Sequence, residues 1–229
     1  MNVRAAILVI CLVLGFAAAP PPARAEKDTD KPEPQALVTA ADESLKRFVA
    51  DPEMTWFRDH APQARALLIV PKMVRGGFIF GGSGGRGVLL ARDPKTGDWS
   101  QPAFYAIGSM TFGLQIGAEL SEVILVVMTD AGVDSLLSTS FKLGGDVSVA
   151  AGPVGAGAKA ATADVLAFSR SKGLFGGLNV EGAIVNAKPD WNQAYYGRPT
   201  SATDILIRRQ VSNPGSATLR GTVAAATHK

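Results

Sequence analysis

Cysteine and histidine are scarce in this sequence of 229 residues. Its one cysteine, Cys11, lies in an apolar run near the N-terminus, and its two histidines, His60 and His228, lie far apart. A disulfide framework, a thiolate centre and a multi-histidine metal site each need more of these residues than the chain supplies. A histidine-dependent catalytic triad is equally hard to build. We therefore expect neither an enzyme nor a metal or cofactor site.

A strong charge of one sign is also missing. The sequence has 23 basic and 20 acidic residues, which gives a net charge of +3. Cleavage of the N-terminal segment described next removes Arg4 and Arg24 and leaves a net charge of about +1. Nucleic-acid-binding proteins generally carry a larger excess of lysine and arginine, so we expect no nucleic-acid partner. An apolar content of 47% with 7% aromatic residues is typical of a globular protein with an aliphatic core.

Residues 1–25 have the pattern of a secretory signal peptide. A positive charge precedes an unbroken apolar run at residues 5–19, and a small-x-small cleavage pattern, Ala-Arg-Ala, ends at Ala25. The run is too short to span a bilayer comfortably, and no second run approaches that length. We expect cleavage near Ala25, export to the periplasm or cell envelope, and a flexible tether at residues 26–35. Cys11 lacks the small preceding residue of a lipid-attachment motif, and whether it is lipidated stays open.

Hydrophobic periodicity predicts an α+β fold. Helical spacing of apolar residues marks 36–50, and a short helix begins at Asp51-Pro52 and ends at Pro62. Further helices are expected at 130–141 and 200–210, and residues 211–229 read as a weakly ordered tail or weak helix. Between them, glycine and turn residues separate β-prone runs. These runs are 66–71, 74–80, 86–92, 102–107, 111–118, 122–129, 146–157, 163–171 and 176–185. We expect one domain at 36–210, with a mostly antiparallel, strongly bent, glycine-rich sheet and helices at both ends.

A glycine-rich stretch at residues 82–87 matches the dinucleotide-binding pattern G-x-G-x-x-G. That pattern needs a helix directly after its last glycine, because the pyrophosphate meets the helix N-terminus. Only six residues separate Gly87 from Pro94, and no acidic residue follows where the ribose partner belongs. We therefore expect no nucleotide. The glycines are expected to form a strand–bend–strand with close backbone approach. A similar stretch at 175–185 predicts a matching strand of the same sheet.

Basic and aromatic residues flank both glycine segments. They are Lys72, Arg75, Phe80 and Arg86 near the first and Arg170, Lys172 and Phe175 near the second. If the two segments are neighbours, five cations gather on one rim beside aromatic rings, which favours an acidic lipid headgroup or membrane surface. The alternative is that these are solvated strand ends. The apolar stripe of residues 36–50 likewise either lies on a membrane or packs in the core.

Four segments of the chain together resemble a known family. They are LLIVPKMVRGGFIFGGSGGRGVLL, QIGAELSEVILVVMT, FKLGGDVSVAAGPVG and FSRSKGLFGGLNVEGAIV, in that order. Over roughly residues 40–210 the sequence resembles the SYLF domain family. The resemblance implies a non-enzymatic phospholipid-binding module, actin-regulatory in eukaryotic relatives and here an exported bacterial member without cofactor. It implies anionic phospholipid as partner. The alternative is an envelope scaffold that binds a protein through the sheet edge or the amphipathic segment.

Overall fold

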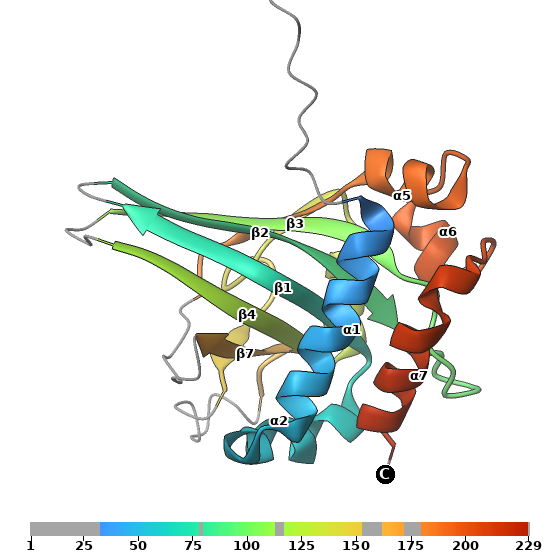
Figure 1. Ribbon diagram of the computed structural model, residues 1–229, viewed down its shortest axis with the longest axis horizontal. Helices are drawn as coiled ribbons and strands as arrows, with labels where there is room; N and C mark the ends of the chain where they lie inside the picture. The colour runs from blue at the N-terminus through green and yellow to red at the C-terminus, as the bar shows by residue number, and fades with distance from the viewer. Residues whose placement is uncertain (1–32, 78–79, 113–116, 153–161, 172–179, 229) are drawn as a thin grey trace, which may run out of the picture. The chain divides into compact units, whose positions relative to one another are not determined.

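An eight-stranded sheet forms the centre of the fold (Figure 1). The computed structural model describes residues 33–77, 80–112, 117–152, 162–171 and 180–228. The strands lie in the order β5-β8-β3-β2-β1-β4-β7-β6, and the β6–β7 pair is parallel whereas the other pairs are antiparallel. Their bounds are β1 Ala66–Gly77, β2 Phe80–Ala91, β3 Ala103–Phe112, β4 Gly117–Val127, β5 Ser140–Lys142, β6 Val149–Ala151, β7 Val165–Ser171 and β8 Ile184–Ala187.

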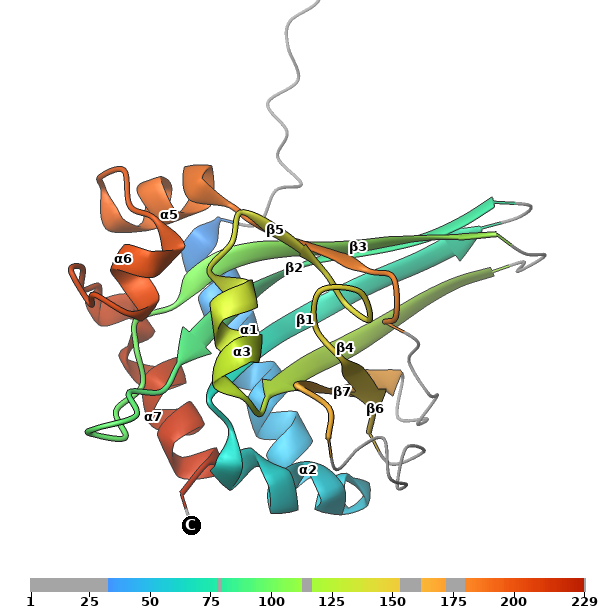
Figure 2. The same cartoon turned by 180° about the vertical axis from the view of Figure 1, so that it is seen from behind.

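Helices at both ends of the chain pack on this sheet. They are α1 Pro34–Ala50, η1 Pro52–Met54, α2 Thr55–His60, η2 Ala61–Gln63, α3 Asp130–Leu136, α5 Pro189–Tyr196, α6 Ala202–Leu206, η4 Pro214–Ser216 and α7 Ala217–Ala226. α1 and α7 lie side by side over one face of the sheet, which we call the helix face (Figure 1). α3 lies against the opposite, rear face (Figure 2). The expected α+β domain with a curled, mostly antiparallel sheet is confirmed.

The central strands are buried on both faces, which explains their continuous apolar runs. In β1, Leu67 and Ile69 belong to the core under α1, whereas Leu68 and Val70 belong to the core on the rear face. The apolar stripe of α1 packs in the core between α1 and the sheet. Its buried members are Leu37, Val38, Ala41, Leu45 and Phe48. The amphipathic pattern at 36–50 therefore reflects core packing, the second of the two alternatives, and the stripe is not free to lie on a membrane.

We expected Pro71 to end a strand, but it lies within one. β1 continues through it to Gly77, so the separate strands predicted at 66–71 and 74–80 are one. The register shifts between Ile69 and Lys72 against β2 and between Val70 and Met73 against β4, so two residues of β1 oppose one on each neighbour. A bulge of this kind leaves a residue without ladder partners, which tolerates a proline that has no N–H to donate.

The glycine segment 80–91 is one continuous strand and not a strand–bend–strand. β2 is paired along its length with β1 and with β3. The irregularity lies in the neighbouring β1 bulge, which approaches β2 closely. A Cβ at Gly87 would lie 2.6 Å from the Ile69 carbonyl oxygen, and one at Gly85 would lie 2.6 Å from that of Lys72. The predicted close approach of backbones is therefore present, although the bend belongs to the other strand.

The predicted match between residues 80–90 and 175–185 is wrong over its described part. Residues 175–179 lie outside the described residues. Gly182, which aligns with the mid-strand Gly87, sits in a turn with φ +82°, and β8 begins only at Ile184. β3 separates β8 from β2 in the sheet. The two segments are therefore neither equivalent nor neighbouring strands.

Several element boundaries also differ from the prediction. The strand expected at 111–118 is the end of β3 and the start of β4, with 113–116 outside the described residues. The helix expected at 130–141 ends at Leu136, because Ser140 already pairs with β8. The helix expected at 200–210 is the short α6, closed at its start by a Ser201–Asp204 capping box. In the described part of the chain, no helix is long and apolar enough to cross a membrane.

Candidate functional site

The four long strands extend beyond the helices that cover the sheet. Figure 1 shows β1, β2, β3 and β4 continuing past α1 and α7, with no helix over the helix face of this part. We call this part the overhang and define it by residues 73–77, 82–85, 107–109 and 119–121. Because each strand alternates its side chains between the two faces, the overhang has a helix side and a rear side of different chemistry.

The helix side of the overhang is apolar and nearly bare. Val74 and Leu120 face each other across β1 and β4 and are 44% and 46% exposed. Gly84 pairs with Val74 on one side and with Gly108 on the other, and Gly82 lies one step further on β2. We call these five residues the apolar strip. It is a two-residue apolar ridge beside a floor of glycine backbone.

The glycines of the strip are not required by packing. A Cβ at Gly84 would meet no described atom closer than the Ile107 carbonyl oxygen at 3.7 Å, and one at Gly108 none closer than 3.5 Å. Both are ordinary van der Waals distances, in contrast to the collisions at Gly85 and Gly87 on the rear side. Glycine weakens a strand interior, and contacts with the described residues do not explain its use at these positions.

Two basic residues border the apolar strip on the same face. Lys72 is exposed and pairs in register with Arg86. The Arg86 guanidinium carbon lies 4.9 Å from the centre of the Trp191 ring, a cation–π contact. Among the described residues, no carboxylate forms an ion pair with either cation. The strip therefore has a positive border toward the body of the domain.

The other predicted rim residues are placed differently. Arg170 lies on the helix face but is held by Asp51, with Nε–Oδ2 3.0 Å, and by Glu122, with Nη1–Oε2 3.2 Å. Hydrogen bonding to Asp51 raises the pKa of Arg170 further. Arg75 lies on the rear side, where it pairs with Glu119 at 3.8 Å. Lys172, Phe175 and the side chain of Phe80 lie outside the described residues. Of the predicted set, the structure brings Lys72 and Arg86 together, without an ion pair to any of the described residues.

Arg170 belongs to an ion network that joins α1 to the sheet. Glu122 on β4 also accepts a hydrogen bond from Arg47 of α1, with Nε–Oε1 2.8 Å. Glu122 and Asp51 are both largely buried, with side chains 14% and 13% exposed. A half-buried network of this kind holds the end of α1 against β4 and β7. Its role is structural. The network could not be predicted from local sequence patterns, because its four members come from three distant segments.

Two titratable groups with shifted pKa values, Tyr105 and Asp164, make contacts between elements. Burial raises the pKa of Tyr105, whose hydroxyl donates to the Leu136 carbonyl at 2.7 Å. Hydrogen bonds from Ser148 and Thr129 lower the pKa of Asp164. The Tyr105 hydrogen bond joins β3 to α3, and the Asp164 hydrogen bonds join the segment before β7 to the start of α3 and to Ser148. Within the described residues, no group of three or more histidine, cysteine, aspartate or glutamate side chains could hold a metal ion.

The uncovered apolar strip with its positive border is the candidate site of this domain. The family described as Ysc84, Las17-binding protein actin regulator, matches residues 108–226, more than half of the chain. The chain belongs to this family, and the resemblance to the SYLF domain is thereby confirmed. The match begins within β3 and does not reach β1 or β2.

Three relatives show how the similarity is distributed. LAS seventeen-binding protein 3 of Saccharomyces cerevisiae is 37% identical over 159 residues, covering 66% of this chain and 34% of its own length. Protein YSC84 of the same yeast is 36% identical over 155 residues, covering 64% and 33%. Human SH3 domain-containing YSC84-like protein 1 is 31% identical over 151 residues, covering 63% and 44%. The matched region is therefore less than half of each relative.

Proposed function

We propose that this chain is a non-enzymatic phospholipid-binding protein that rests the helix side of its overhang on anionic membranes. The observation that carries the proposal is the apolar strip, where Val74 and Leu120 are exposed beside the cations Lys72 and Arg86. Apolar side chains flanked by cations suit the boundary between acyl chains and negatively charged headgroups.

The expected affinity is modest. Full burial of a valine or leucine side chain contributes about 1.5–3 kcal/mol, and roughly half of each ridge residue is already covered, so about 1 kcal/mol remains for each. Each cation near an anionic surface adds about 1 kcal/mol. A total of a few kcal/mol gives reversible binding that weakens with salt, because the electrostatic part is screened.

The proposal includes export to the periplasm or cell envelope. It is supported by the signal-peptide pattern of residues 1–25. In that compartment the abundant anionic surface is envelope phospholipid, whereas actin is absent. Export therefore favours a lipid surface over the actin-related partners of the eukaryotic relatives.

Co-sedimentation with vesicles tests the proposal. The protein from residue 26 onward is mixed with vesicles of phosphatidylcholine alone or with added phosphatidylglycerol, at low and high salt. We expect sedimentation with the anionic vesicles that falls with salt and is lost in a Val74→Ser, Leu120→Ser variant. Ile207→Ser is the matched control, because Ile207 is 50% exposed but lies outside the overhang. Equal binding by both variants, or none by the parent protein, contradicts the proposal.

A protein partner is the second candidate function. The names of the relatives favour it, since one is a LAS seventeen-binding protein and the family is described as an actin regulator. The two routes foreseen from sequence are unfavourable, because the stripe of α1 is buried and the sheet edges β5 and β6 have three residues each. A partner would therefore use the apolar strip itself. Crosslinking in cells from a cysteine placed at Val74 distinguishes the two: one stoichiometric protein, with no vesicle binding, favours the partner.

A further inference from the structure

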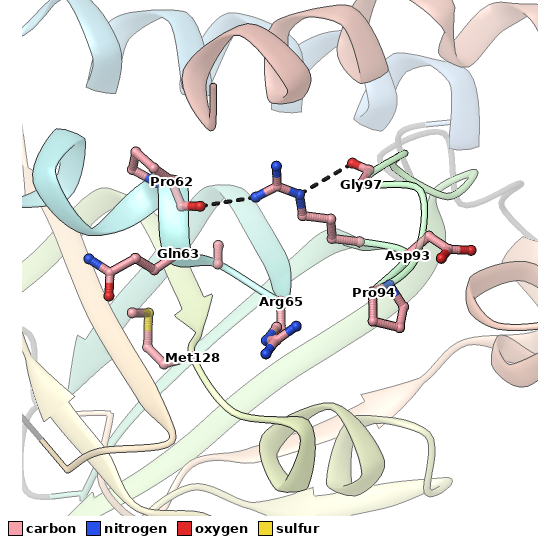
Figure 3. A pocket seen from close by; sticks show the side chains of 9 residues that line it. Pro62, Gln63, Arg65, Asp93, Pro94, Gly97 and Met128 are labelled. Atoms are coloured by element: carbon pink, nitrogen blue, oxygen red, sulfur yellow. Dashed lines mark hydrogen bonds between the residues drawn. The ribbon is translucent and has the colours of Figure 1, made fainter. Parts of the chain in front are cut away.

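A hollow of about 590 Å³ lies at the end of the sheet opposite the overhang (Figure 3). Its walls come from η2, from Ala64 and Arg65 just before β1, from the turn that follows β2, and from Met128 just after β4. Arg65 and Arg92 contribute guanidinium groups, Gln63 an amide and Met128 an apolar surface. This volume is within the usual range for small-molecule sites.

Arg92 is a fixed cation without a carboxylate partner among the described residues. Its Nη1 donates to the Pro62 carbonyl oxygen at 3.0 Å and its Nε to that of Gly97 at 3.2 Å (Figure 3). These neutral acceptors orient the guanidinium, but they do not neutralise it. The half-buried positive charge therefore remains available to an anion.

Arg65 supplies the second cation. Its Nε lies 3.6 Å from Asp130 Oδ1, but the Asp130 side chain is 79% exposed and the Arg65 side chain is 44% exposed. Surface pairs of this kind are weak and readily exchanged for another anion. Arg65 can thus turn to a ligand at little cost.

Asp93, the acidic residue of the lining, is occupied elsewhere. Its Oδ1 accepts the backbone N–H groups of Lys95 at 2.8 Å and Thr96 at 3.1 Å, and its Oδ2 lies 3.7 Å from Arg209 Nε. These backbone hydrogen bonds are the largest cause of its lowered pKa. The carboxylate stabilises the turn after β2, and the charged lining of the hollow consists of this carboxylate and the two guanidinium groups of Arg65 and Arg92.

We infer that this hollow binds a phosphate-bearing small molecule between Arg65 and Arg92. Guanidinium groups recognise phosphate through paired N–H donors, and two of them from different walls suit a tetrahedral dianion. The hollow exceeds the volume of phosphate, which leaves room beside Gln63 and Met128 for an attached organic group. The ligand is either a soluble phosphomonoester or the headgroup of a lipid.

The site is independent of the proposed membrane surface. Arg65 and Val74 are nine residues apart on or beside β1, which corresponds to roughly 30 Å along an extended strand. The bulge shortens this span only slightly. Loss of one site should therefore leave the other intact, and the two proposals can fail separately.

A titration followed by ¹⁵N nuclear magnetic resonance tests the inference. Inorganic phosphate, glycerol 3-phosphate and glycerol are added to the protein from residue 26 onward at low salt. We expect saturable shifts of the Gln63 and Gly97 amide signals with both phosphates and none with glycerol. Arg65→Gln should weaken binding by roughly tenfold or more, the loss typical of one charge-assisted hydrogen bond. Arg208→Gln removes an arginine that is paired with Asp204 and does not line the hollow, and should leave binding unchanged.

The outcomes separate the two ligand sources and the two sites. Saturable shifts with glycerol 3-phosphate identify a soluble ligand; shifts only with dispersed short-chain phosphatidic acid, lost in Arg65→Gln, identify a headgroup. An absence of saturable shifts, or equal loss in Arg65→Gln and Arg208→Gln, overturns the inference. Binding that is lost in the Val74→Ser, Leu120→Ser variant and kept in Arg65→Gln assigns the signal to the overhang and likewise overturns it. Thermal unfolding of each variant verifies that it is folded.

Discussion

At the scale of single residues, alternate glycines of β2 have opposite roles. Gly87 on the rear side faces the β1 bulge, where an added Cβ would collide with the Ile69 carbonyl and Val70. Gly84 on the helix side faces open space, with its nearest contact at 3.7 Å. We predict that Gly87→Ala destabilises the protein by about 1–3 kcal/mol through overpacking. Gly84→Ala should change stability by less than about 0.5 kcal/mol. Urea unfolding measures both, and equal losses would contradict the distinction.

The sequence could not separate these glycines. The string Gly-Gly-Ser-Gly-Gly-Arg-Gly shows that side chains are excluded or unnecessary, and close backbone approach was predicted from it. Which glycine needs which neighbour depends on the one-residue register shift at Val70 and Pro71 of another strand. The same limit applies to Arg170, since its partners Asp51 and Glu122 lie 119 and 48 residues away. The local sequence shows that an arginine is present, but it does not show whether a carboxylate from a distant segment pairs with it.

At the scale of elements, α7 shows how packing decides what propensity leaves open. Residues 211–229 are rich in alanine, threonine and serine, and we expected a weak helix or a disordered tail. The structure has a ten-residue helix there, fixed against α1 by buried Leu219 and Val223. Trp99 also donates from Nε1 to Thr227 Oγ1 at 3.0 Å. Short helices are stabilised mainly by an apolar face in tertiary contact, which a single-sequence pattern detects poorly.

Truncation of this helix contact should be costly. We predict that Leu219→Ala lowers the free energy of unfolding by about 2–5 kcal/mol, because it leaves a cavity between α7 and α1. Thr218→Ala, at the exposed neighbouring position, is the control and should change it by less than about 0.5 kcal/mol. Chemical denaturation measures the difference. A weakly attached tail would instead show no effect of either substitution.

The junction of α3 with the sheet predicts a pH dependence. Asp164 accepts hydrogen bonds from Thr129, the N-cap residue of α3, and from Ser148, and these bonds lower its pKa. A lowered folded-state pKa contributes stability above the unfolded value near 3.8, and this contribution is lost as the pH falls through the folded value. The melting temperature of Asp164→Asn should therefore lie below that of the parent protein at pH 6, and the gap should narrow below about pH 4. The exposed Asp59→Asn is the control; a gap that widens in acid would contradict the assignment.

At the scale of the whole domain, the overhang is the feature that sequence reasoning missed. Fold class, the antiparallel strands and the N-terminal helix follow from periodicity, because each is local. How much of the sheet the helices cover depends on segments that are far apart in the sequence. α1 and α7 come from opposite ends of the described chain and stop short of the hairpin ends of β1 to β4 (Figure 1). The sequence pattern alone therefore does not show that Val74 and Leu120 are exposed. The site predicted from sequence consisted of basic and aromatic residues instead.

Because helices cover only part of the sheet, we predict that its backbone amides differ in their protection from hydrogen–deuterium exchange. Amides of β1 and β2 between the two cores should exchange with deuterium far more slowly than amides of the same strands in the overhang, where cover is absent on the helix side. Anionic vesicles should slow exchange in peptides containing Val74, Gly84 and Leu120 while leaving α7 unchanged, because docking buries only the helix side of the overhang. Neutral vesicles are the control. If anionic vesicles instead protect α7 or the hollow beside Arg65, the membrane surface lies elsewhere on the molecule and the overhang requires a different ligand.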